Sequence, residues 1–133
     1  MDSTELRIDT SATPLYDLTR DVRDFCRGRG DGLVHVFAPH ATAGIALIEL
    51  GAGSEPDLLE TLGRVLPRDD RWVHRHGSPG HGADHVLPAI VAPFVVVPVL
   101  DGEIALGTWQ HVVFVDLNDD NPSRKVRLSF LAG

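Results

Sequence analysis

The stretch FVVVPVLDGEIALGTWQHVVFVDL, residues 94–117, decides the fold class of this chain. Its β-branched and aliphatic residues run in short blocks, which predict strands at 94–100, 103–109 and 111–117. Asp101-Gly102 is a two-residue hairpin signal between the first two blocks. A further strand is expected at 125–132. Consecutive strands of this kind indicate a largely antiparallel sheet.

The residues before this stretch predict strands at 5–10, 32–39 and 43–50 and helices at 17–30 and 54–67. Asp17 can cap the first helix, and Ser54 with Asp57 resembles a capping box for the second. A short helical turn is expected at 85–91. The whole chain, residues 1–133, is therefore predicted to be one α+β domain, a mostly antiparallel sheet or sandwich with two main helices.

Composition narrows the classes of function. The net charge of −7 and pI near 5.3 argue against a nucleic-acid binder, which needs Lys and Arg to neutralise phosphates. An anionic ligand would require a local basic pocket. The single cysteine, Cys26, leaves no intrachain disulfide and suits a reducing cytosol. The N-terminus lacks the pattern of a signal peptide, and the apolar run 90–100 is too short to span a bilayer. We therefore expect a cytoplasmic protein with no membrane partner.

Strand 94–100 is apolar on both faces, and strand 111–117 nearly so. Two helices are not enough to bury both faces of these strands. A second sheet of the same chain or a neighbouring subunit must supply the remaining cover, so homo-oligomerisation is expected on physical grounds.

Residues 71–88, RWVHRHGSPGHGADHVLP, contain four of the seven histidines of the chain, separated by Gly, Pro and Asp. Neutral imidazole is the commonest metal ligand near neutral pH. His81 and His85 have i, i+4 spacing and lie on one face if the segment is helical, although Gly80 and Gly82 make a regular helix doubtful. His74 and His76 are weaker candidates, because a strand-like pair also fits a solvated loop.

Other candidate site residues lie elsewhere in the chain. His40 and Thr42 stand at the corner between strands 32–39 and 43–50, and Glu49 ends the second strand. If those strands form a hairpin, His40 and Glu49 are separated by more than about 20 Å. They can then share a site only across a subunit boundary or if the strands diverge. The alternative is a solvated turn histidine and a solvated strand-end glutamate.

The strings GTWQ (107–110) and NPSRKVRL (121–128) offer possible ligand contacts. Gly107 can mark a close approach to a ligand, and Trp109 and Gln110 lie beside it, although a core tryptophan at a strand kink is equally consistent. Arg124 and Lys125 belong to the densest positive charge of the chain and form a candidate phosphate clamp. A charged edge strand is the alternative reading.

The strings GLVHVFAPHATAGIALIEL, WVH, DHVLPAI, VVVPVLDGEIALGTWQ and DLNDDNPSRKVRLSFLAG together resemble the YjbQ family, from about residue 30 to the C-terminus. The corner HATA is similar to the HTSA or HTTA corner of the family and places His40 on the family's histidine. His85 falls on the histidine of its AHI string and Glu49 on the glutamate of its NEN string. His81 departs from the family, which has Asn or Asp there, and this change favours metal binding.

The resemblance implies a compact α+β homotrimer with polar pockets between subunits. It also implies a secondary thiamine-phosphate synthase activity, which joins a pyrimidine diphosphate to a thiazole phosphate. In that interpretation His40, His85 and Glu49 are catalytic, while Thr42, Trp109, Gln110, Arg124 and Lys125 contact the ligand and its phosphates. A divalent metal, Mg²⁺ or Zn²⁺, would lie at His40, His81 and His85, with the last two of these ligands supplied across the subunit boundary.

Two classes of function follow. The first is an enzyme that acts on small phosphorylated heterocycles, here a transferase. The second is a metal- or anion-binding homotrimer without turnover, or a metal-assisted hydrolase. Metal content distinguishes them, because only the second class requires a stoichiometric transition metal.

Overall fold

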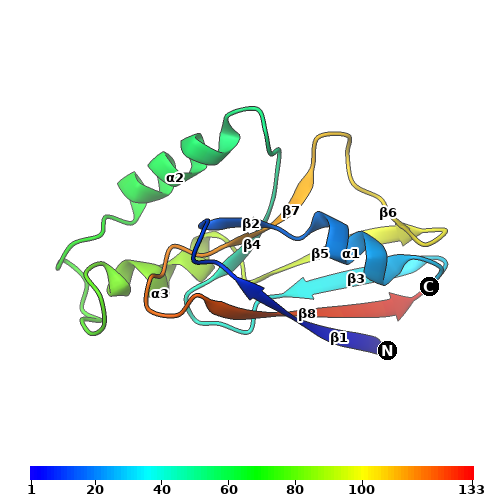
Figure 1. The fold of residues 1–133 in the computed structure, drawn as a ribbon, viewed down its shortest axis with the longest axis horizontal. Coiled ribbons are helices and arrows are strands. Elements are labelled where there is room, and N and C mark those ends of the chain that lie inside the picture. The colour runs from blue at the N-terminus through cyan, green and yellow to red at the C-terminus, as the bar shows by residue number, and fades with distance from the viewer.

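The computed structural model describes residues 1–133 and confirms an α+β fold built on two antiparallel sheets (Figure 1). Three helices accompany the sheets: the two main helices predicted, and a third that extends the short helical turn expected at 85–91. In chain order the elements are β1 (Asp2–Asp9), β2 (Leu15–Asp17), α1 (Thr19–Cys26), β3 (Gly32–Phe37), β4 (Gly44–Ile48), α2 (Ser54–Val65), α3 (His81–Ile90), β5 (Phe94–Leu100), β6 (Glu103–Ile104), β7 (His111–Val115) and β8 (Ser123–Ala132). No helix is both long and apolar enough to cross a bilayer.

The larger sheet has the strand order β1-β8-β3-β5-β6, and the smaller one β2-β7-β4. β7 is the central strand of the smaller sheet, and its alternate side chains enter two different cores. Val112 and Phe114 pack with α1 and the inner face of the larger sheet. Val113 and Val115 pack with Leu62 and Leu66 of the α2 region and with α3. The doubly apolar sequence of β7 is thus explained within one chain, with α2 and α3 at one end of the molecule and α1 towards the other (Figure 1).

The strands β3 and β4 do not form the hairpin considered from the sequence. β3 pairs with β5 and β8, whereas β4 pairs with β7. The corner between them instead carries the chain from one sheet to the other, and it docks on the segment before β5. Ala38 N–H donates to Pro93 O, and Ile45 N–H donates to Ala92 O, both at 2.8 Å. His40 and Glu49 therefore belong to diverging segments, which was the alternative geometry to a hairpin.

The hairpin predicted at Asp101-Gly102 is present between β5 and β6. Both residues have the positive φ that such a turn requires, 50° and 78°. The second strand is shorter than expected and ends at Ile104. GTWQ therefore lies in the β6–β7 connection and not in a strand, where Gln110 Oε1 accepts the Gly107 N–H at 2.8 Å.

The helix starts differ from the expected caps. Gly53, with φ 102°, precedes α2, and Ser54 is its first residue without a capping hydrogen bond. The capping box was therefore wrong. Asp17 does organise the start of α1, since its carboxylate accepts from the backbone N–H and the hydroxyl of Thr19 at 2.9 and 2.6 Å.

The outer face of the larger sheet is apolar and open to solvent in one chain. On β5, Phe94, Val96 and Leu100 are 45%, 46% and 60% exposed. Leu33 of β3 and Leu131 of β8 lie opposite each other on the same sheet and are also exposed. This face matches the uncovered strand surface predicted for 94–100.

Candidate metal centre

The first turn of α3 brings two histidines together. Gly80, in a left-handed conformation with φ 82°, precedes the helix and does not interrupt it. His81 and His85 are then one turn apart on the same face, and their Nε2 atoms are separated by 2.9 Å. The predicted i, i+4 pair is therefore present in the chain, and the doubt about a helix at Gly80 and Gly82 was unfounded.

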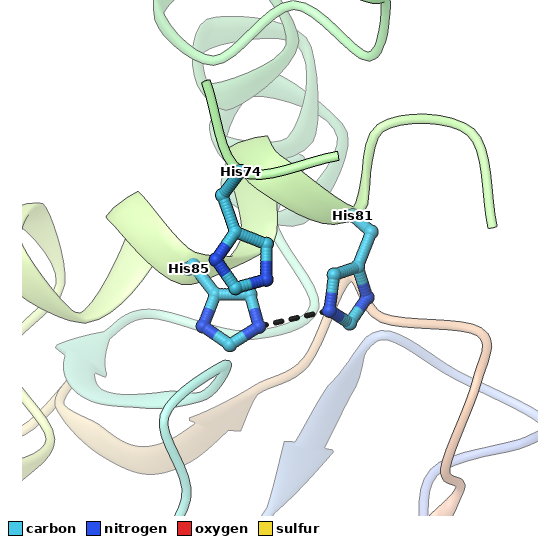
Figure 2. Close-up of side chains that lie close together, drawn as sticks. All are labelled: His74, His81 and His85. Atoms are coloured by element: carbon cyan, nitrogen blue, oxygen red, sulfur yellow. Dashed lines mark hydrogen bonds between the residues drawn. The ribbon is translucent and has the colours of Figure 1, made fainter. Parts of the chain in front are cut away.

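His74 joins this pair from the loop before α3. Its ring stacks on that of His85, with centroids 4.0 Å apart. Gly82 makes this approach possible, because a Cβ there would lie 2.4 Å from His74 O and 2.5 Å from Trp72 Cβ. One ligand nitrogen from each of His74, His81 and His85 lies within 4.8 Å of the others (Figure 2). We call these three residues the histidine cluster.

A carboxylate supports the histidine cluster from behind. His81 Nδ1 lies 2.8 Å from Asp120 Oδ2. Because a carboxylate only accepts, the proton is on Nδ1, and the Nε2 of His81 accepts from His85 Nε2–H at 2.9 Å. Asp120 also accepts the backbone N–H of Ser78 at 3.3 Å, and this bond, followed by the contact with His81, lowers the pKa of Asp120. The arrangement is the carboxylate–histidine pair that commonly orients a metal ligand.

A buried ion pair fixes the surrounding segments. Asp84, in the first turn of α3, is 1% exposed and accepts from the guanidinium of Arg68, including an Nη2–Oδ2 bond of 3.2 Å. Asn118 Nδ2 donates to the same carboxylate at 3.0 Å, and Asn118 Oδ1 accepts the N–H of Asp120 at 3.0 Å. The segment after α2, the start of α3 and the β7–β8 connection are thereby tied together around the histidine cluster.

The charge state of the histidine cluster suits a cation. Partial burial lowers the pKa of His74 and of His85, and the neighbouring imidazoles lower both further. Both rings are therefore neutral at pH 7 and offer lone pairs. The three neutral imidazoles and the Asp120 carboxylate bonded to His81 form a donor set that can bind a cation.

The spacing is close to that of a coordination site. Ligand nitrogens lie about 2.0–2.1 Å from Zn²⁺, so two of them on one ion can be at most about 4.2 Å apart. The 2.9 Å between His81 and His85 already meets this limit. The largest separation in the histidine cluster, up to 4.8 Å, requires a small inward movement of a side chain. A pocket of about 200 Å³, lined by no hydrophobic residue, opens beside His74 and His81.

The other predicted site residues lie outside this pocket. His40 Nε2 accepts the backbone N–H of Lys125 at 2.9 Å, and its ring meets Phe114 edge-on. Burial, and then the charge of Arg124, lower the pKa of His40. Glu49 follows β4 and is half-buried. Within one chain neither residue joins the histidine cluster, so a role for them there depends on a second subunit.

The residues predicted to contact phosphate either bond to other side chains of the same chain or lie apart from one another. Arg124 is 3% exposed; its Nε and Nη2 donate to Asp116 at 2.7 and 2.9 Å, and Nη2 also donates to Thr42 Oγ1 at 2.9 Å. Lys125 pairs with Glu5 on β1 at 3.2 Å. Arg124 and Thr42 are therefore internal in this chain, and the clamp is not assembled. Trp109 is 69% exposed in the β6–β7 connection, with Gln110 beside it.

Sequence reasoning missed Asp120 and Asn118 as parts of the site. They lie in DLNDDN, residues 116–121, a run of polar residues directly after the apolar strand β7. Such a run after a buried strand is a usable signal for a polar site, but nothing in the sequence connects it to His81.

Comparisons with known proteins agree with the fold and extend over the whole chain. A model of the protein family described as "UPF0047 protein YjbQ-like" matches residues 4–133. The UPF0047 protein Rv2556c of Mycobacterium tuberculosis is 62% identical over 133 residues, covering all of both chains. A UPF0047 protein of Archaeoglobus fulgidus is 31% identical over 123 residues, 92% of this chain and 96% of the other.

Solved structures give the same result. The hypothetical protein APE1520 of Aeropyrum pernix K1 superimposes with a TM-score of 0.87 at 28% identity, covering 100% of both chains. A YbjQ-like protein of unknown function, SSO2532 of Sulfolobus solfataricus P2, gives a TM-score of 0.90 at 23% identity, covering 99% of this chain and 97% of that one. The second likeness concerns the fold alone.

Proposed function

The chain belongs to the UPF0047 family of YjbQ-like proteins, and we propose that its function depends on a divalent transition-metal ion bound by His74, His81 and His85. One observation carries the proposal. Three imidazole nitrogens lie within 4.8 Å of one another, and one of these rings is held by a carboxylate on its other nitrogen. Ligating histidines almost always have such a partner.

The donor set selects the ion. Mg²⁺ prefers oxygen ligands and keeps several waters, whereas imidazole suits Zn²⁺, Ni²⁺ and Co²⁺. Of the two ions considered from the sequence, Zn²⁺ is therefore the one we propose. His40 is not needed as a ligand in this assignment, since His74 takes the third position.

The polarity of the pocket indicates the class of ligand. It is lined by charged and polar side chains, among them Arg75, next to His74 and His81. When bound, an ion with an open position can polarise a phosphoryl oxygen or lower the pKa of its water. Arg75 would hold an anionic group at the entrance, and Asp120 would keep His81 in the ligating tautomer. We propose a small phosphorylated or otherwise anionic substrate and a metal-assisted hydrolysis or transfer.

Thiamine-phosphate synthesis is the more specific form of this proposal. It is supported by the family resemblance and by Arg75, a cation in the lining of the pocket that a phosphate could meet. The test is the formation of thiamine phosphate from the pyrimidine diphosphate and the thiazole phosphate, with His85→Ala as the comparison. Equal rates for the two proteins would remove the histidine cluster from this reaction.

We also propose that the protein is a homotrimer joined through the outer face of the larger sheet. Phe94, Val96 and Leu131 are about half exposed in a single chain, and large apolar patches on soluble proteins usually mark an interface. His40 and Glu49 would then act across the boundary. Sedimentation of the untagged protein should give about three times the 14.4 kDa chain mass. Val96→Glu should shift it to monomers, and a monomeric wild type would overturn the assembly.

The metal site itself is tested by elemental analysis of untagged protein and by calorimetric titration with Zn²⁺. We expect one ion per chain, and His85→Ala should weaken zinc binding by about 100-fold or more, since it removes a direct ligand. His111→Ala is the matched control, because His111 begins β7, accepts the Leu50 N–H through Nδ1 and lies outside the histidine cluster. Zinc binding no tighter in the wild type than in His85→Ala would contradict the proposal.

A further inference from the structure

We infer that His76 is a fourth, displaceable ligand of the same ion, so that the loaded site rests closed and an anion enters by replacing this imidazole. The inference rests on the metal site proposed above and adds a specificity-determining residue to it.

The ring distances carry the inference. Two imidazoles that share one Zn²⁺ have ring centres about 5 Å apart at the tetrahedral angle and at most about 6.3 Å apart. The ring of His76 lies 4.3 Å from that of His74 and 4.6 Å from that of His81. Within the histidine cluster, His81 and His85 are likewise 4.6 Å apart. His76 is therefore close to His74 and His81. Its 6.2 Å to His85 exceeds the tetrahedral spacing, and it is not among the three residues whose nitrogens all lie within 4.8 Å of one another, so its ring must turn inward to bind the ion.

The backbone explains why His76 faces the histidine cluster. His74 and His76 flank Arg75 in a segment without helix or strand, and Arg75 Nε donates to Trp72 O at 2.7 Å. Gly77 follows with φ 76°, and a Cβ there would meet Asp120 Oδ2 at 2.7 Å and His81 Nδ1 at 3.0 Å. The chain after His76 thus lies directly against the His81–Asp120 pair, which keeps the His76 ring beside the ion position.

The position of His76 separates it from the two ligands on α3. Like His74, it is exposed and lines the polar pocket, whereas His81 and His85 are half-buried and belong to the helix. A site with four protein ligands is closed, whereas a reactive zinc site keeps one position open. His76 is the ligand that can leave without disturbing the helix, and its departure would open the ion towards the pocket.

The test uses Co²⁺ as a coloured substitute and azide as the probe anion. We expect Co²⁺-loaded wild type to show a four-coordinate nitrogen spectrum and to bind azide weakly. His76→Ala should retain Co²⁺, change the visible spectrum and bind azide about tenfold more tightly or better, because no imidazole has to be displaced. Added imidazole should restore the wild-type spectrum. His111→Ala should behave as wild type.

The outcomes separate this inference from the proposed function. Co²⁺ bound in both proteins with the same spectrum and the same azide affinity would show that His76 is not a ligand, while the three-histidine site stands. Failure of the wild type to bind Co²⁺ at all would overturn both.

Discussion

The β7–β8 connection contributes a carboxylate to each of two polar networks, Asp116 to one and Asp120 to the other. The two networks differ in whether every charged group has a partner of opposite charge. At the start of the connection, Asp116 accepts from Arg124 and from Thr10 Oγ1 at 2.6 Å, and all of these groups are buried. Further along, Asp120 accepts from His81, whose second nitrogen faces only other imidazoles. The first network is closed, because each charge meets its opposite. In the second, the Nε2 atoms of His81 and His85 meet only each other, at 2.9 Å, and no cation or carboxylate lies on that side.

This difference separates a polar cluster with a structural role from the one that we propose to bind a metal ion. Arg124 is a buried cation whose guanidinium already donates to Asp116 and Thr42, so it is not free to bind a ligand in this chain. A group of neutral imidazoles with a carboxylate behind one of them is the donor set that we propose to hold a cation. The predictions below test this contrast.

The largest effect is expected from Arg124→Ala. Removing the guanidinium leaves the Asp116 carboxylate buried without its cation, and breaking such a pair costs about 3–5 kcal/mol of the free energy of unfolding. Urea denaturation measures this loss. Lys125→Ala is the control, because Lys125 forms an exposed pair with Glu5 and should change stability little. Equal losses of stability for the two variants would mean that the buried Arg124–Asp116 pair does not stabilise the fold more than an exposed pair does.

Asp120→Ala should leave stability nearly unchanged and weaken zinc binding by about 10- to 100-fold, as loss of an outer partner of a ligand does. Asp119→Ala removes a neighbouring carboxylate that makes no hydrogen bond to His81 and serves as the control for general electrostatics. Calorimetric titration compares them. Similar losses in affinity for both would show that net negative charge, and not the orientation of His81, supports the site.

Gly82→Ala should weaken zinc binding by about tenfold, on the scale of a lost outer partner, since the new methyl group must displace the 72–74 segment. Gly63→Ala is a matched change inside α2, where a Cβ meets nothing within 4 Å. It should leave zinc binding intact and raise stability by up to about 1 kcal/mol. Unchanged zinc affinity in Gly82→Ala would exclude His74 as a ligand.

The smallest effect concerns pH. The pKa values of His40, His74 and His85 are lowered by burial. Below the ordinary histidine pKa of about 6.5, the unfolded chain takes up protons that the folded chain refuses. Stability without metal should therefore fall as the pH drops below that value and level off once the folded histidines are protonated. Zinc affinity should fall over the same range.

Variants divide this slope between the two networks. His74→Ala with His85→Ala should remove the part due to the histidine cluster, and His40→Gln the part beside Arg124. Thermal unfolding at pH 5 to 8 measures both. A slope that survives all three changes would contradict the assignment.

The sequence predicted the elements better than their partners. Strands β5, β7 and β8 follow from their apolar blocks, and the Asp101-Gly102 turn from a two-residue signal, because these depend on local chemistry. The divergence of β3 and β4 could not be predicted from local chemistry, because each of them pairs with strands more than forty residues away in the sequence. The corner between them is determined by its contacts with Ala92 and Pro93, which no local pattern encodes.

The site divides in the same way. The spacing of His81 and His85 predicted their meeting, because it depends only on the period of a helix. The approach of His74 to His85 was not predicted, since it depends on the absence of a side chain at Gly82. Asp120 was not considered because it lies 39 residues from His81 in the sequence. Arg124 was assigned to a ligand because its buried partner, Asp116, could not be known before the fold.

The central strand β7 has a consequence for exchange with solvent. It is hydrogen-bonded on both edges, and Val112 through Val115 are buried on both faces in two different cores. Neither core can open without exposing this strand, so its amide protons should exchange with deuterium only when the whole chain unfolds. A metal ion that binds the folded chain and not the unfolded one makes global unfolding rarer, and so slows exchange at every amide that depends on it. The amides of β7, far along the chain from the histidines, would therefore report occupancy of the histidine cluster as a change in protection.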